Sequence, residues 1–224
     1  MDAVIKVGGS LAADTAVLRA LCLELSRVAT LGCRMVVVPG GGEFADVVRA
    51  VDGRFGLGSS VSHRMAVLGM DQFGLLLSGL IPGCRVASSL GVVCGLAGSG
   101  RAVVLLPSRL VFRARSLVSS WDVTSDSIAG YVAGRLGVGK LVLVTDVDGV
   151  FSGDPKVDAG AELLEEISAS GLLELSVRTS VDRFLPRVVL KFGLECFVVN
   201  GRFPERVSEV LAGKSTVCTR IIPK

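Results

Sequence analysis

Two glycine-rich turns lie near the beginning of the sequence, and each follows a short apolar run. Gly8, Gly9 and Ser10 come after "VIKV", and the three glycines of 40–42 come after "MVVVP". Glycine lets backbone N–H groups approach an anion closely, and a helix that follows adds its partial positive N-terminus. Because ligands of parallel sheets bind at the carboxyl ends of the strands, two such turns on neighbouring strands would form a phosphate site.

Lys6 interrupts the first apolar run two residues before the glycine pair. Its ammonium could reach over both turns and neutralise charge on a phosphoryl group that passes from a donor to an acceptor. The alternative is a lysine on an edge strand, with its charged end in solvent, beside two ordinary tight turns. The combination of one lysine with two glycine turns favours phosphoryl transfer.

Asp126 lies in the segment "TSDSIAG", at the predicted start of a helix. A carboxylate there could cap the helix and do nothing more. Alternatively, it could accept hydrogen bonds from a lysine and from backbone groups close to the transferred phosphate, and so hold these donors still. Both interpretations remain open from the residues alone.

A second acidic segment, "TDVDGVFSGDPK" at 145–156, follows the apolar run "LVLV". Its spacing excludes an EF-hand, because a third early ligand and the closing glutamate are missing. The segment fits a loop around the base and ribose of a nucleotide, with Lys156 near a phosphate oxygen. Asp-Gly and Asp-Pro pairs are also common in surface turns. Walker A and dinucleotide glycine motifs are missing, so a nucleotide would be bound in another way.

The hydrophobic pattern predicts an α/β protein with a mainly parallel sheet between helices. Asp14 and Ser62 are predicted to begin helices, and Gly32 and Gly137 to end them. The predicted strands are 3–7, 34–38, 85–87, 102–106, 140–145 and 195–199, and the predicted helices are 15–31, 43–51, 62–80, 125–136 and 204–211.

Length and composition limit the class of protein. The chain has 224 residues, half of them hydrophobic, which is enough for one domain with a substantial core. Its net charge of +3 is spread along the sequence, which argues against a nucleic-acid partner. No stretch approaches the roughly 18 uninterrupted apolar residues of a membrane span, and Asp2 and Lys6 break up the start that a signal peptide would need. Six widely spaced cysteines suggest reduced thiols in the cytoplasm.

The segments "KVGGS", "VVPGGG", "TSDSIAG" and "TDVDGVFSGDPK", in this order, resemble the amino acid kinase superfamily over nearly the whole chain. The resemblance implies a three-layer αβα sandwich in a single domain, 1–224, with the acceptor site in about 1–120 and the ATP site in 121–224. It implies ATP and Mg²⁺ as cofactors and a small phosphorylated substrate, and it assigns no residue to a metal. We also expect a homo-oligomer, for which the apolar predicted helix at 65–80 could supply an interface as easily as core. The residues carried over are Lys6 and Asp126 for catalysis, Gly8, Gly9, Ser10, Thr145, Asp146, Asp148, Gly149, Val150, Phe151, Asp154, Pro155 and Lys156 for ATP, and Gly40, Gly41, Gly42 and His63 for the acceptor.

The sequence departs from several members of that superfamily. Isopentenyl phosphate kinases carry a histidine just after the second glycine turn, where this chain has Ala45 and Asp46. Acetylglutamate and uridylate kinases carry a Gly-Gly-Met-x-x-Lys segment, and here Asp182 stands where the lysine is expected. Arg183 or Arg187 could supply the missing cation.

The segments "WDVTSDSIAG" and "NGRFPERV", the stretch 63–72 and the short length resemble the branch of the superfamily that acts in methanofuran biosynthesis. That resemblance implies a phosphate monoester as acceptor, which ATP converts to a diphosphate. The alternatives are a kinase for isopentenyl phosphate, uridylate or a carboxylate, and a nucleotide-binding relative without catalysis. His63, the single histidine, could contact the acceptor phosphate or only pack or cap a helix.

Overall fold

The computed structural model describes the chain except for residues 115–116, 118, 154–156, 159 and 176–178. Within the described residues, eight strands form one sheet in the order β3-β4-β2-β1-β5-β7-β8-β6. Neighbouring strands are parallel except for the antiparallel pair β7 and β8, so the sheet is mainly parallel, as predicted. The strands are β1 (Ala3–Val7), β2 (Met35–Pro39), β3 (Arg85–Ala87), β4 (Val103–Leu105), β5 (Lys140–Thr145), β6 (Glu166–Ser168), β7 (Glu195–Asn200) and β8 (Cys218–Ile222).

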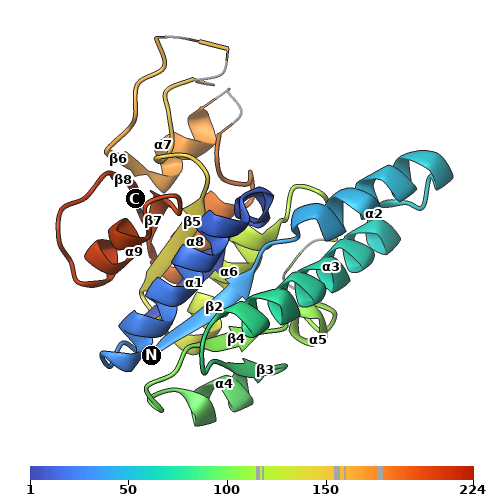
Figure 1. Ribbon diagram of the computed structural model, residues 1–224. Helices are drawn as coiled ribbons and strands as arrows, with labels where there is room; N and C mark the ends of the chain where they lie inside the picture. The colour runs from blue at the N-terminus through green and yellow to red at the C-terminus, as the bar shows by residue number, and fades with distance from the viewer. Residues whose placement is uncertain (115–116, 118, 154–156, 159, 176–178) are drawn as a thin grey trace.

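Helices cover both faces of this sheet, which confirms the three-layer αβα class (Figure 1). One apolar core joins the sheet to α1, α3 and α9, and the other joins it mainly to α6, α7 and α8. The helices are a 3₁₀ helix η1 (Gly9–Ala13), α1 (Thr15–Thr30), α2 (Gly42–Phe55), α3 (Ser59–Leu80), α4 (Leu90–Leu96), α5 (Ser108–Val111), α6 (Ser125–Leu136), α7 (Ala169–Glu174), α8 (Leu185–Phe192) and α9 (Pro204–Leu211).

Strand β1 lies in the middle of the sheet, paired with β2 on one side and β5 on the other. Side chains alternate between the two faces of a strand. Ile5 therefore packs into the core under α1, while Val4 packs into the core under α6. Lys6 shares the face of Val4, so its side chain is directed to the α6 side.

The sequence located the long helices and strands and also the short strands β3 and β4. It missed η1, β6, β8, α4, α5, α7 and α8, because these are short or mix polar residues into the pattern; β8, for example, is "CTRII". Asp14 caps α1 as predicted, since its carboxylate accepts from the amides of Ala16 and Val17 at 3.0 and 3.1 Å. The prediction for Ser62 is wrong: α3 begins at Ser59, and the Ser62 hydroxyl donates to the carbonyl of Gly58.

Candidate active site

The two glycine turns are packed directly against each other, backbone to backbone. A Cβ atom at Gly9 would lie 2.1 Å from the amide nitrogen of Gly42, and one at Gly40 would lie 2.6 Å from the amide nitrogen of Gly9. Gly42 also has a φ of +52°, which disfavours other residue types. The turns predicted from the sequence therefore lie side by side, and the close contact itself requires glycine.

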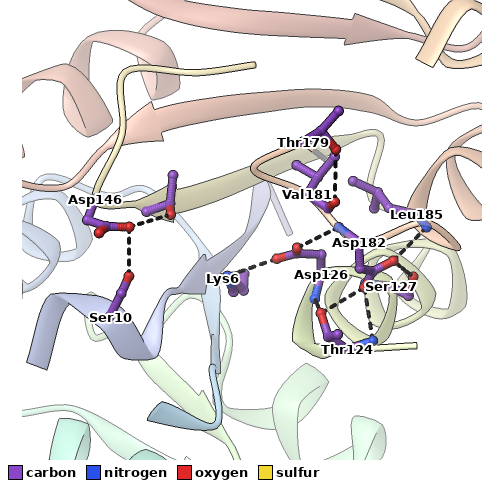
Figure 2. A network of polar contacts seen from close by, with 11 residues as sticks. Lys6, Ser10, Thr124, Asp126, Ser127, Asp146, Thr179, Val181, Asp182 and Leu185 are labelled. Carbon is purple, nitrogen blue, oxygen red and sulfur yellow. Dashed lines mark hydrogen bonds and ion pairs between the residues drawn. The ribbon is translucent and has the colours of Figure 1, made fainter. Parts of the chain in front are cut away.

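Lys6 forms an ion pair with Asp126, with 2.8 Å between Nζ and Oδ1 (Figure 2). Both residues are buried, at 9% and 5% exposure. The alternative of an edge-strand lysine is therefore excluded, because β1 is central and Nζ is not in solvent. Asp126 is not the cap of α6 either, since Thr124 is the N-cap residue.

The other oxygen of Asp126 accepts a hydrogen bond from the backbone amide of Asp182 at 3.1 Å. Asp126 thus contacts one lysine and one backbone N–H, as the functional interpretation of this residue requires. The side chain of Asp182 faces the first turn of α6, where it accepts hydrogen bonds from Thr124 and Ser127 (Figure 2). Burial and the nearby Asp126 carboxylate raise the pKa of Asp182, although hydrogen bonds from Ser127 and Thr124 act in the opposite direction.

A first cavity of about 480 Å³ lies beside the glycine turns, under α2 and α3. Lys6 and His63 line it, and so do Arg49 and Trp121, whose guanidinium and ring are 5.1 Å apart. Its other lining residues are Gly8, Gly9, Ser10, Ala13, Gly41, Gly42, Glu43, Ala45, Asp46, Ala66, Val67, Met70, Val123, Thr124, Ser125, Ile128 and Ser180. Gly40 is absent from this lining, because it packs beneath Gly9.

A second cavity of about 780 Å³ lies beside α7 and the start of α8. Trp121, Thr124 and Ser180 line both cavities, so the two meet there. Lys6 lines the first cavity and Asp126 the second, which places their ion pair at the boundary. The remaining lining residues are Asp122, Leu172, Leu173, Glu174, Leu175, Thr179, Val181, Asp182, Arg183, Pro186 and Arg187.

The predicted nucleotide loop begins at the carboxyl end of β5, next to the first glycine turn. The hydroxyl of Ser10 donates to Asp146 at 2.9 Å, and the hydroxyl of Thr145 contacts the same oxygen at 3.3 Å. Asp148 is bonded within the protein, to Asn200 at 3.0 Å and Arg206 at 2.6 Å. Burial acts to raise the pKa of Asp148, but these two donors lower it overall.

The rest of this loop is attached to the carboxyl-terminal part of the sheet. The amide of Val150 donates to the hydroxyl of Thr219 at 2.8 Å, and Val150 is fully buried, so its side chain is part of the core. The carbonyl of Gly149 accepts from Ser180 at 2.9 Å, which brings the loop to the wall shared by both cavities. Phe151 forms an isolated bridge with Leu163. The predicted ATP residues Asp154, Pro155 and Lys156 lie outside the described residues.

His63 is buried, with its Nε2 3.3 Å from the carbonyl oxygen of Val123. Burial lowers the pKa of His63, although the bond to Val123 acts to raise it. The ring is therefore neutral near pH 7 and donates its Nε2–H to that carbonyl. Its position on the wall of the first cavity keeps both predictions open, contact with an acceptor and simple packing.

Sequence reasoning missed Arg49, Trp121 and Ser180. Arg49 follows the second glycine turn by two helical turns, and its stacking on Trp121 links α2 to a segment far away in the sequence. The indole N–H of Trp121 also donates to Asp52 of α2 at 3.3 Å. The helical period of α2 could have placed Arg49 on the cavity side, but the partner Trp121 depends on tertiary structure.

Within the part of the chain that the structure describes, no three His, Cys, Asp or Glu side chains are grouped to hold a metal ion. The same residues include no helix with the length and apolar character needed to cross a membrane.

The chain belongs to the amino acid kinase family, whose model matches residues 1–200. It is 34% identical to the [5-(aminomethyl)furan-3-yl]methyl phosphate kinase of Methanocaldococcus jannaschii, a match that covers 98% of this chain and 97% of that protein. It is 27% identical to the uridylate kinase of Methanoculleus marisnigri over 78% of this chain and 75% of that one. The crystal structure of a uridylate kinase from Archaeoglobus fulgidus has the same fold, with a TM-score of 0.78 at 21% identity over 99% of this chain and 100% of that one.

Proposed function

We propose that this protein transfers the γ-phosphoryl group of ATP to a phosphate monoester and produces a diphosphate and ADP. The observation that carries the proposal is the buried ion pair of Lys6 and Asp126 at the boundary of two cavities, next to two glycine turns. Family membership supports the kinase activity. The two cavities supply one space for a donor and one for an acceptor.

In this proposal the acceptor phosphate occupies the first cavity, beside the amides of the second glycine turn and α2, and the γ-phosphate of ATP extends into this cavity toward Gly8, Gly9 and Ser10. ATP occupies the second cavity, which is lined by Leu172 and Leu173 of α7 and by Arg187 of α8. Arg183 and Arg187, proposed as substitutes for the family's lysine, both line this second cavity. Mg²⁺ enters as part of the substrate, bound to the phosphates of ATP.

The transfer itself needs no general base, because the acceptor phosphate is already ionised. One of its oxygens attacks the γ-phosphorus, a new P–O bond forms, and the bond between the γ-phosphorus and the bridging oxygen breaks to release ADP. Lys6 neutralises the charge on the transferred group, and Asp126 holds the Lys6 ammonium in place. Such preorganised electrostatic contacts are typically the largest single contribution to catalysis.

The acceptor that we propose is [5-(aminomethyl)furan-3-yl]methyl phosphate, in methanofuran biosynthesis. It is supported by the full-length relative of that name at 34% identity. A coupled assay for ADP tests it, with this compound, uridylate and isopentenyl phosphate as separate acceptors. Turnover with the furan alone supports the proposal, whereas preferred turnover of uridylate would replace it with the second candidate, which the uridylate kinase relatives favour.

The assay also separates two further alternatives. A nucleotide-binding protein without catalysis would show a thermal shift with ATP and no ADP from any acceptor. A kinase for carboxylates would form an acyl phosphate, which hydroxylamine traps.

We also propose a cytoplasmic homo-oligomer. Leu68, Leu75 and Leu76 of α3 are exposed, at 47%, 55% and 42%, and a second copy of the chain could cover them. Light scattering after size-exclusion chromatography would give the mass, and a mass of one chain would contradict the oligomer.

A further inference from the structure

Asp182 receives hydrogen bonds from two helices at once. Its Oδ2 accepts from the amide and hydroxyl of Thr124, at 3.0 and 2.9 Å, and from the amide of Ser127 at 2.9 Å, all at the start of α6. Its Oδ1 accepts from the hydroxyl of Ser127 and from the amides of Phe184 and Leu185, at 3.0 and 2.8 Å, at the start of α8. One carboxylate therefore caps both helices and joins their amino ends.

The backbone of the same residue contacts the proposed catalytic pair. The amide of Asp182 donates to Oδ2 of Asp126, so that Oδ1 of Asp126 is directed to Lys6 (Figure 2). The side chain of Asp182 already accepts bonds at both oxygens. It is therefore suited to hold Asp126 in position and not to bind a phosphate itself.

α6 and α8 pack closely against each other. A Cβ atom at Gly130 of α6 would lie 2.9 Å from Val188 of α8, and one at Gly134 would lie 2.2 Å from the ring of Phe192. The helices thus contact each other along their length. At their amino ends, the bonds from Thr124 and Ser127 tie the first turn of α6, on which Asp126 lies, to Asp182.

We propose that Asp182 is a positioning residue for phosphoryl transfer, which holds the Asp126 carboxylate against Lys6 by joining the first turns of α6 and α8. The inference rests on the proposed function. The inference gives a role to Asp182, which stands where other family members have a lysine. Asp182 supplies no cation, and instead it orients Asp126, which holds the Lys6 ammonium.

Asp182→Asn keeps the volume of the side chain but removes its charge and one of its two acceptor oxygens. An amide group has one acceptor oxygen, and its NH₂ group would face backbone N–H donors of either α6 or α8. One helix would lose its cap, and Asp126 would shift relative to Lys6. Misplacement of a catalytic group by about 1 Å can reduce the rate about 100-fold.

The experiment measures kcat and both KM values for the wild type, Asp182→Asn, Asp126→Asn and the double variant, with ATP and the furan phosphate. We expect Asp182→Asn to lower kcat by about 10- to 100-fold and to leave both KM values within about twofold. In the Asp126→Asn background the same substitution should have no further effect on kcat, because Asp182 acts through Asp126. An unchanged kcat, or equal losses in both backgrounds, would overturn the inference.

Asp71→Asn is the matched control. Asp71 of α3 accepts bonds from the amide and hydroxyl of Ser108 at the start of α5, so it caps another helix in the same way, outside the two cavities. Its loss should lower the melting temperature and leave kcat unchanged.

If Asp182→Asn does not fold, Ser127→Ala offers a second test. It removes one donor to Asp182 and should lower kcat in the wild type but not in Asp126→Asn. A wild type that forms no ADP with any acceptor would contradict the proposed function, and the inference with it. An active wild type together with variants of unchanged kcat would contradict the inference alone.

Discussion

On the β1–β2 side of the ion pair, backbone atoms of two glycine turns form the wall of the site. On the α6–α8 side, the wall consists mainly of side chains. On the first side, a Cβ atom added at Gly9 or Gly40 would collide with a backbone amide of the neighbouring turn, and one added at Gly8 would collide with the carbonyl oxygen of Val144. On the second side, arginine, leucine and threonine side chains surround a larger cavity. The comparison suggests that almost any substitution on the glycine side disrupts the site, whereas single substitutions on the α6–α8 side reduce binding or activity by smaller amounts.

The largest effect should come from removing the group that lies between the two sides. Lys6→Ala leaves Asp126 buried without a cation and removes the charge that the transferred phosphoryl group needs. We expect kcat to fall about 100- to 1,000-fold, the loss typical of a missing electrostatic donor, with a smaller change in the KM for ATP. Initial rates of ADP formation measure it. Lys214→Ala, at an exposed lysine, is the control, and a Lys6→Ala enzyme of normal turnover would remove our central assignment.

The glycine side is tested by one added methyl group. In Gly9→Ala the new Cβ would meet the amide of Gly42 at 2.1 Å, so the two turns must separate. We expect a loss of about 2–3 kcal/mol in the free energy of unfolding, as for other overpacked sites, and it should appear in urea denaturation. Gly79→Ala in α3 meets no atom within 4 Å and should gain up to about 1 kcal/mol. Equal stability of the two variants would contradict backbone contact between the turns.

The α6–α8 side should respond more gradually. Arg183→Ala removes one cation from the second cavity, and we expect the KM for ATP to rise about tenfold, which corresponds to one lost charged hydrogen bond. Arg187→Ala should have a smaller effect, because its guanidinium lies 5.9 Å from the ring of Phe184 and is already held there. Steady-state kinetics at varied ATP distinguish the two. Arg101→Ala, at an exposed position outside both cavities, is the control. If Arg183→Ala raised only the KM for the acceptor, the second cavity would bind the acceptor and the first cavity ATP.

The smallest effect concerns pH. Burial lowers the pKa of His63 in the folded state, so the unfolded state binds more protons just below the usual histidine pKa of about 6.5. Stability from this residue is therefore present above that pH and lost as the pH falls through the folded value. Urea denaturation from pH 7.5 to 5 should show a decline that is weaker in His63→Gln. The same slope in both proteins would mean that His63 is not held neutral by burial.

Sequence reasoning singled out residues that the structure brings together where the signal lies in local segments. Lys6 and Gly9 were singled out because a lysine within an apolar run and paired glycines are unusual for a strand and its turn, and Asp126 because it is an acidic residue at a predicted helix start. The relation between Lys6 and Asp126 was also expected, and the structure brings them to 2.8 Å. The fold class was predictable for a similar reason, since buried parallel strands produce apolar runs.

The rest depends on contacts between distant segments. Asp182 appeared in the sequence only as a residue in the place of a lysine, because its partners are backbone amides, which no side-chain pattern shows, and two hydroxyls more than fifty residues away in the sequence. Asp148 looked like a nucleotide ligand, yet it is bonded to Asn200 and Arg206, more than fifty residues away. Trp121 appeared in the sequence only as part of the segment "WDVTSDSIAG", and its contact with Arg49 depends on tertiary structure.

The order of strands has a practical consequence. β1 to β4 occupy one side of the sheet and β5 to β8 the other, so the β1–β5 pairing is a seam between the first and second halves of the chain. The Lys6–Asp126 pair crosses this seam. A protein split into two fragments near residue 120 could then serve as its own complementation reporter, in which catalysis returns only when the fragments reassemble, and the titration of one with the other would yield the affinity of the seam.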